Sequence, residues 1–332
     1  FDAARPAQRA LRTIALIHQQ VGFNAAVAEI AVSSADIRRI HKAGKRAVLI
    51  GMENGGPLEG RLDLASTYHR LGVRYITLTH NKNNAICDSS TDEPRWNGLS
   101  PFGVELVAEM NRLGMMIDVS HISDAAFYDV IEHSRAPVIA SHSAARALCS
   151  SPRNLSDEML SALAANGGVF HVVFYSGFLS DEYAEKSEAV REELRPRLAK
   201  IREETGGDSE RFYARVMPLW LEHAPEPPGI EVLIDHIDHA VRVAGIEFAP
   251  AVAIGETEIP LRGGGLYRYA VVFRVYAGVL YAPADVAGAD ILEADVPKRL
   301  ELHYLLNISA DDFRRSGTAL IEKQQGPEVL GT

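Results

Sequence analysis

One stretch of the chain, residues 114–143, restricts the fold more than any other. It contains two short apolar runs that each lead into a Ser-His pair, at His121 and His142. The segment between them, 124–133, has the length and the apolar spacing of one helix. A strand, a crossover helix and a second strand form a right-handed parallel unit, so both strands end at the same edge of one sheet. The pattern therefore predicts that the two histidines lie side by side.

Apolar runs of the same kind recur along the chain about 20 to 40 residues apart, a spacing that is typical of β/α units. The lack of polar alternation within them favours parallel strands that are buried on both faces. A closed barrel of such units needs eight strands, so the sequence predicts an α/β fold with a partial (β/α)8 TIM-type barrel. The five predicted strands are 47–51, 75–78, 115–119, 137–140 and 169–174.

Two helices are predicted before the first strand of this series. Apolar residues recur at helical spacing in residues 1–30, which we interpret as helix. Ser33 and Asp36 form a capping box for a second helix, which is predicted to end near Gly44.

The composition of the chain changes after the fifth predicted strand. The highly charged segment 181–223 is typical of a solvated helical pair, and 224–229 breaks the chain. An amphipathic helix over 230–243 then carries His236 and His239 on one face. Because no HExxH glutamate accompanies them, we favour structural or surface histidines over metal ligands.

Beyond residue 244 the polar and apolar residues alternate, which indicates half-exposed antiparallel strands at 267–281 and 298–307. The glycine triplet 263–265 is interpreted as a turn, and Ser309 as the cap of a last helix. We therefore predict two domains: 1–244, the barrel portion without its first and last strands, and 245–332, a small antiparallel α+β segment.

Composition excludes several classes of function. The net charge of -10 argues against a nucleic-acid-binding surface or a polybasic membrane anchor. The two cysteines give neither a disulfide framework nor a zinc-knuckle spacing. No run is apolar enough to span a bilayer, and no signal peptide is recognisable, so a soluble protein of unknown compartment is expected.

Four ionisable side chains stand at the ends of successive predicted strands: Glu53, His80, His121 and His142. Their shared position makes chance placement improbable, because the carboxyl edge of a β/α barrel is where active sites form. Imidazoles with a carboxylate are ligands that suit Zn²⁺. A zinc-bound hydroxide would hydrolyse amides, esters or phosphoesters.

Two alternatives bear on this site. A Ser-His-Asp arrangement using Ser120 or Ser141 is disfavoured, because neighbouring side chains of an extended chain point to opposite sides. Arg153, just past the fourth group, is either a clamp for a substrate carboxylate or a loop arginine in water; spacing alone does not decide between them.

Several segments together resemble the membrane (renal) dipeptidase family of zinc peptidases, over residues 5–245. They are GMENGG, YITLTHNKNNAICDSS, NGLSPFGVELVAEMNRLGMMIDVSHIS, PVIASHSAARAL, SPRNLSDEML and IDHIDHAVRVAGI. The resemblance implies a (β/α)8 metallo-dependent hydrolase that cleaves dipeptides with two zinc ions. It also implies a role for each matched residue. Glu53 would bridge the metals, His121 and His142 would complete the second zinc site, His80 would steady the oxyanion, and Arg153 would bind the substrate carboxylate.

The chain departs from this family at two places. The family's first strand ends in a His-x-Asp pair that holds the other zinc, and residues 1–30 contain no such pair. The family's Gly-Ser-Asp-Phe-Asp-Gly segment is replaced by EFAPAVAIGETEIPL. We therefore expect one retained zinc position, at Glu53, His121 and His142, and an activity impaired by the missing ligands.

Residues 245–325 resemble the N-terminal part of chalcone isomerase-like domains, some of which bind fatty acids. The alternative function is thus an inactive fusion whose C-terminal part binds a fatty acid or another small apolar ligand. A partial barrel exposes strand edges and apolar faces. The C-terminal segment, or a second copy of the chain in a homodimer, would cover them.

Overall fold

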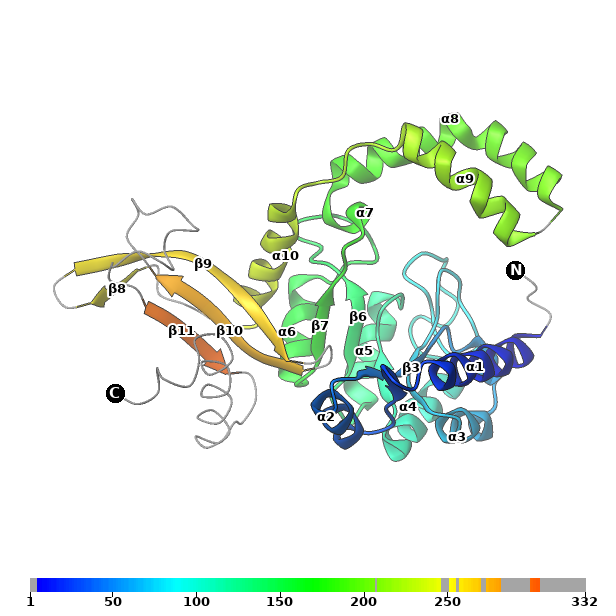
Figure 1. Cartoon of the computed structure of the whole chain (residues 1–332), viewed down its shortest axis with the longest axis horizontal. Coiled ribbons are helices and arrows are strands. Elements are labelled where there is room, and N and C mark those ends of the chain that lie inside the picture. Colours follow the sequence, from blue (N-terminus) through cyan, green and yellow to red (C-terminus); the bar gives the residue numbers. More distant parts are fainter. Residues whose placement is uncertain are drawn as a thin grey trace. The chain divides into compact units, whose positions relative to one another are not determined.

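A computed structural model describes residues 5–206 and 208–245, and four later strands by their backbone. The chain divides into two compact units, Phe1–Gly245 and Ile246–Thr332. Each unit is described by itself below. Figure 1 shows the elements of both.

A five-stranded parallel sheet forms the centre of the first unit, with its strands in the order β3-β4-β5-β6-β7. This confirms the predicted α/β fold, and each of the five predicted runs contributes one strand. The strands are β3 (Ile50–Glu53), β4 (Val73–Thr77), β5 (Met116–Asp118), β6 (Ile139–Ser143) and β7 (Val169–Val172).

Helices join the strands as the sequence pattern predicts. Three of these helices are capped by a serine, at Ser100, Ser123 and Ser156. In each, the serine hydroxyl accepts a hydrogen bond from a backbone N–H of the first turn, which has no partner within the helix. The joining helices are α3 (Leu62–Arg70), α4 (Pro101–Leu113), α5 (Asp124–His133) and α6 (Asp157–Ala165), with a short η1 (Gly56–Leu58) after β3. Their apolar faces pack on the sheet in one core that includes Ile76, Met110, Ile117, Phe127 and Leu163.

The N-terminal segment differs from the prediction in one respect. Helix α1 (Pro6–Phe23) ends early, and β1 (Ala28–Ile30) pairs in parallel with β2 (Arg46–Val48). The predicted run 47–51 therefore divides at Leu49, because its first half pairs with β1 and its second half, β3, pairs with β4. Between them, α2 (Ser34–Lys42) begins at Ser33 as predicted, with the Ser33 hydroxyl 3.1 Å from the Asp36 nitrogen.

The charged segment forms the predicted helical pair, α8 (Asp181–Thr205) and α9 (Ser209–His223), after a short α7 (Ser176–Leu179). The pair has a small core of its own around Leu194, Ile201 and Leu219. Helix α10 (Ile230–Val243) packs against α6. No helix in the described part of the chain is long and apolar enough to cross a lipid bilayer.

The second unit contains an antiparallel sheet in the order β11-β10-β9-β8. The glycine triplet 263–265 lies inside β9 and is paired with residues 278–280, so the predicted turn is wrong. Glycine weakens a strand without ending it when the ladder continues on both sides. The predicted helix capped by Ser309 lies outside the described residues. The strands are β8 (Ala251–Ile254), β9 (Thr257–Tyr269), β10 (Phe273–Tyr281) and β11 (Arg299–Tyr304).

Candidate metal centre

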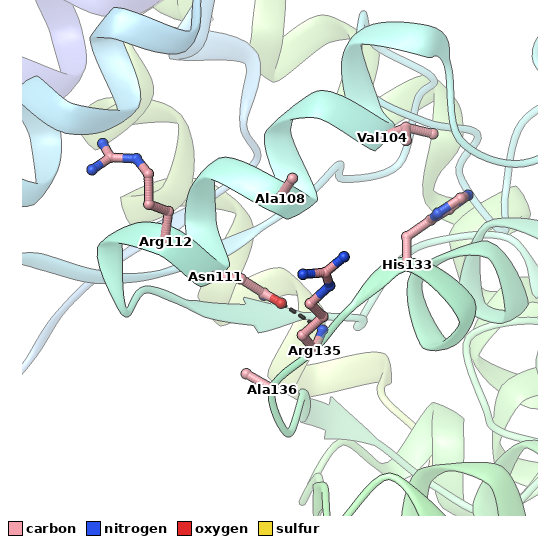
Figure 2. A pocket seen from close by; sticks show the side chains of 7 residues that line it. All are labelled: Val104, Ala108, Asn111, Arg112, His133, Arg135 and Ala136. Carbon is pink, nitrogen blue, oxygen red and sulfur yellow. Dashed lines mark hydrogen bonds between the residues drawn. The ribbon is translucent and has the colours of Figure 1, made fainter.

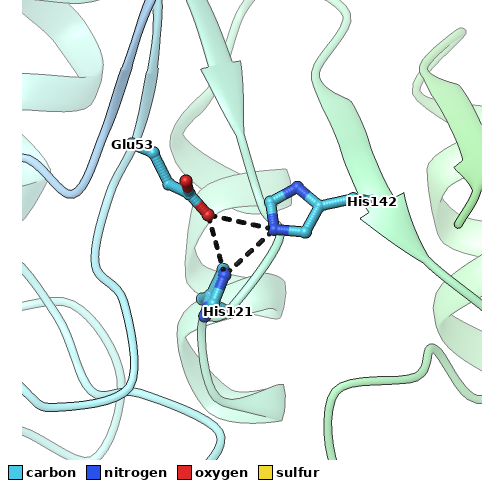
Figure 3. Close-up of side chains that lie close together, drawn as sticks. All are labelled: Glu53, His121 and His142. Carbon is cyan, nitrogen blue, oxygen red and sulfur yellow. Dashed lines mark hydrogen bonds and ion pairs between the residues drawn. The ribbon is translucent and has the colours of Figure 1, made fainter. Parts of the chain in front are cut away.

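The three predicted metal ligands, Glu53, His121 and His142, converge at the carboxyl edge of the parallel sheet (Figure 3). The His121 and His142 Nε2 atoms lie 2.9 Å apart. The Glu53 Oε1 atom lies 3.2 Å from the His121 Nε2 and 3.3 Å from the His142 Nε2. Ligands that surround one tetrahedral Zn²⁺ at 2.0–2.2 Å would be about 3.3 to 3.6 Å apart. The donor set therefore fits such an ion, and the observed separations lie a few tenths of an ångström below this range or at its lower end.

The strand ends explain the convergence. Glu53 is the last residue of β3, His142 lies within β6, and His121 follows β5. His121 has a left-handed backbone, with φ of 75°, as does Asn54 next to Glu53, with φ of 82°. Non-glycine residues seldom adopt this conformation, and it is found preferentially at functional sites.

Burial disfavours the protonated form of both imidazoles, His121 and His142. Desolvation is the largest cause that lowers the pKa of His121 to about 2. Repulsion from Arg153, and from His80 and His142 when they are protonated, adds to it. Desolvation is also the largest cause of the lowered pKa of His142. Neutral imidazole is the form that binds metal. The His121 Nδ1 is buried without a hydrogen-bond partner, so this ring is fixed by packing and by its Nε2 contacts.

His80 lies beside these three residues rather than among them. Its Nε2 is 3.7 Å from the Glu53 Oε1, and its ring centroid is 4.2 Å from that of His121, with 30° between the planes. The side chain is 43% exposed. This exposure makes the ring accessible to a molecule bound next to Glu53.

Arg153 is a buried cation and not a loop arginine in water. Its residue is only 9% exposed, its Nη2 donates to the His142 carbonyl at 3.3 Å, and its Nε has no partner. Burial lowers its pKa to about 10, which leaves it charged at neutral pH. The guanidinium carbon lies 4.9 Å from the ring centroid of Phe178. The sequence analysis did not identify Phe178; the aromatic cluster after the fifth apolar run was the available signal.

Asp118 is a second residue that the sequence analysis missed. Its fully buried carboxylate accepts hydrogen bonds from the Thr77 and Ser141 hydroxyls at 2.6 Å each, and from two backbone N–H groups. The Ser141 Oγ also lies 2.7 Å from the His142 Nδ1. An acidic residue inside an otherwise apolar run was the signal for it.

The contact between Ser141 and His142 corrects one step of the sequence analysis. The two side chains meet because β6 has a register irregularity between Ala140 and Ser143, which breaks the alternation of an extended chain. The order is nevertheless Asp-Ser-His, with the serine in the middle. A Ser-His-Asp nucleophile needs the histidine in the middle, so that alternative stays disfavoured.

The other predicted histidine pair has structural partners. The His236 Nδ1 accepts from the Ala145 backbone N–H at 3.0 Å, and its Nε2 donates to the Leu179 carbonyl at 3.1 Å. The His239 Nε2 lies 2.6 Å from an Asp157 carboxylate oxygen. These contacts join α10 to the loop after β6, to α7 and to α6, as expected for structural histidines.

Two of the hollows among the described residues of the first unit differ in their relation to the site. One, of about 770 Å³, is bounded by α1 and β3 and reaches Glu53 and His80, so it gives access to the candidate site. The other, of about 570 Å³, lies between α4 and α5 near Arg112 and Arg135 (Figure 2). Its lining comes from α4, from the end of α5 and from Arg135 and Ala136, which precede β6. These two residues lie toward the edge of the sheet opposite to the carboxyl edge.

The chain is similar to known proteins in sequence and in fold. The family model for membrane dipeptidase (peptidase family M19) matches residues 2–258, and a chalcone isomerase-like model matches residues 240–331. Among curated relatives, dipeptidase tcpJ of Claviceps purpurea is 46% identical over 147 residues, which are 44% of this chain and 35% of the relative. Dipeptidase 3 of Macaca fascicularis is 44% identical over 145 residues, 42% of this chain and 30% of the relative. The chain thus spans about a third of the length of these two relatives.

Solved structures with a similar fold include peptidases. The probable dipeptidase PvdM from Pseudomonas aeruginosa has a TM-score of 0.58 at 32% identity, with 70% of this chain and 63% of that chain covered. A metallo peptidase from Rhodobacter sphaeroides has the same fold, with a TM-score of 0.55 at 23% identity over 73% of this chain and 59% of that chain. Because the family model covers most of its residues, the chain belongs to the membrane dipeptidase family, peptidase family M19.

Proposed function

We propose that the first unit is a zinc-dependent dipeptidase site, which hydrolyses the peptide bond of dipeptides. The observation that carries this proposal is the convergence of Glu53, His121 and His142, with ligand atoms 2.9 to 3.3 Å apart. Zinc bound there would act as a Lewis acid and would lower the pKa of a water molecule to near neutrality. That chemistry suits the hydrolysis of an unactivated amide.

The surrounding residues supply binding and charge. Arg153 would hold the C-terminal carboxylate of the dipeptide, because a buried guanidinium with an unpartnered Nε favours a planar anion. His80, which is half-exposed and next to Glu53, would donate a hydrogen bond to the carbonyl oxygen as negative charge develops on it. The ring of Phe178, 4.9 Å from the Arg153 guanidinium carbon, would help to hold this side chain by a cation–π contact.

We further propose that one zinc binds per chain. Glu53, His121 and His142 form a three-ligand group in the described residues, while residues 1–30 contain no His-x-Asp pair. A single ion with three protein ligands keeps an open position for water, as catalytic zinc sites do. The loss of a second ion would reduce transition-state stabilisation, so slow turnover is expected.

The test combines metal content with turnover. The full chain is saturated with zinc, loose metal is removed, and elemental analysis and hydrolysis of dipeptides with an L- or D-residue at the C-terminal position are measured. We expect one zinc and slow hydrolysis, with both lost in His121→Ala and both kept in His133→Ala, which removes an exposed histidine of α5. A zinc content that is unaffected by His121→Ala would contradict the assignment of the site.

One observation favours a second candidate function. The chalcone isomerase-like match over residues 240–331 would suit an inactive chain whose C-terminal part binds a fatty acid or a similar apolar ligand. Bound zinc without any hydrolysis, together with saturable binding of a fluorescent fatty acid, would favour this candidate over the dipeptidase.

A further inference from the structure

The hydrogen bonds behind His142 determine which of its nitrogens carries the proton. Both oxygens of the buried Asp118 carboxylate are used. One accepts the backbone N–H groups of Ser120 at 3.0 Å and Ser141 at 2.9 Å. The other accepts the hydroxyls of Thr77 and Ser141, each at 2.6 Å. A carboxylate with four donors is an acceptor only, so the single hydroxyl proton of Ser141 points at Asp118.

The proton of Ser141 is therefore unavailable to His142. Its Oγ presents a lone pair to the His142 Nδ1 at 2.7 Å, and a contact this short between two lone pairs would be repulsive. The His142 Nδ1 must then carry the hydrogen and donate it to Ser141. In a neutral imidazole this leaves the His142 Nε2 as an acceptor. The His121 Nε2, 2.9 Å away, is then the donor of that contact in the metal-free chain.

We propose that Asp118 and Ser141 are positioning residues that hold His142 as the Nδ1–H tautomer, with its Nε2 ready to bind metal. This inference rests on the proposed zinc site, but the tautomer itself is a property of the metal-free chain. A histidine ligand that donates its other ring N–H to a partner is more basic and is fixed in orientation. Here the carboxylate acts through a hydroxyl, and the Ser120 hydroxyl fixes the adjacent backbone by accepting the His142 N–H at 3.0 Å.

Thr77 provides a matched control, because its hydroxyl donates to the same Asp118 oxygen at the same distance but does not contact His142. If Asp118 serves only to tie the strand ends together, Thr77→Val and Ser141→Ala each remove one 2.6 Å hydrogen bond to the same oxygen and have similar effects on zinc affinity, although Ser141→Ala also removes a weaker 3.4 Å contact with the Ser120 hydroxyl. If it acts on His142, only Ser141→Ala affects the ring. Ser141→Thr keeps the hydroxyl and tests for rescue.

The experiment measures the tautomer and the metal affinity separately. In the metal-free full chain at pH 7.5, ¹⁵N-histidine NMR, assigned with His142→Gln, is expected to show a protonated Nδ1 in the wild type, Thr77→Val and Ser141→Thr. Ser141→Ala is expected to shift toward the Nε2–H form. Competition with a chelator is expected to show zinc binding about 10 to 100 times weaker in Ser141→Ala, and within about threefold of the wild type in Thr77→Val.

The NMR and zinc-binding results test the tautomer proposal and the zinc-site proposal separately. An Nε2–H tautomer of His142 in the wild type overturns the inference, and so does an equal loss of zinc affinity in Thr77→Val and Ser141→Ala. A wild type with the Nδ1–H tautomer that binds no zinc refutes the proposed zinc dipeptidase and leaves the positioning of His142 supported.

Discussion

The buried imidazole of His121 makes the metal-free first unit sensitive to acid. Its pKa is about 2 in the folded chain, because burial and nearby cationic groups disfavour the charged form. An unfolded histidine has a pKa of about 6.5. Between these values the unfolded chain binds one more proton than the folded chain, so the free energy of unfolding falls as the pH falls.

The size of this effect follows from the two pKa values. For one histidine, lowering the pH from 7.5 to 5 should reduce the free energy of unfolding by about 2 kcal/mol. We predict that this contribution disappears in His121→Asn. The difference in unfolding free energy between wild type and His121→Asn should therefore decrease by about 2 kcal/mol over that pH range, whatever the difference at pH 7.5.

Urea unfolding followed by tryptophan fluorescence measures this difference for the first unit. Both tryptophans, Trp96 and Trp220, belong to that unit, so unfolding of the second unit does not contribute. The measurement is made in chelator, and His133→Asn controls for the loss of an exposed histidine. A pH-independent difference between wild type and His121→Asn would show that the folded His121 is not desolvated, and would refute the reasoning.

Three further predictions concern packing and binding. Gly103→Ala would place a Cβ 2.2 Å from the Ile86 carbonyl oxygen and should destabilise the first unit by about 1 to 3 kcal/mol in urea. Gly22→Ala, with nothing within 4 Å, should be neutral or stabilising; equal effects of the two would contradict the packing of α4. Asp88→Ala removes the acceptor of the Arg95, Trp96 and Gly98 N–H groups and should cost at least about 2 kcal/mol and alter the tryptophan emission. An unchanged midpoint would be evidence against this loop structure. Arg153→Lys keeps the charge but loses the planar fork, so the KM for dipeptides should rise by at least about tenfold. The KM for dipeptide amides, which lack the carboxylate, should change little, and an equal change for both substrates would exclude the clamp.

Local sequence patterns predicted the architecture of the first unit. Apolar runs and serine caps report the backbone period directly, so α5 spans 124–133 as expected and all five strands are found. The convergence of His121 and His142 followed from the parallel topology alone. The assignment of residues 28–30 to a helix was wrong, because only the pairing of β1 with β2 favours a strand there.

The tertiary structure decided what depends on contacts between distant segments. The split at Leu49 arises because its two sides pair with different strands, β1 and β4. The Asp118–Ser141–His142 contacts require the β6 irregularity, and the position of His121 requires a left-handed backbone. A sequence period assumes a regular backbone, and this backbone departs from regularity at the candidate site. The sequence by itself therefore determined the elements and the strand ends that carry the ligands, whereas only the tertiary structure decided how those ligands are held, because their orientation depends on irregular backbone and on hydrogen bonds between strands.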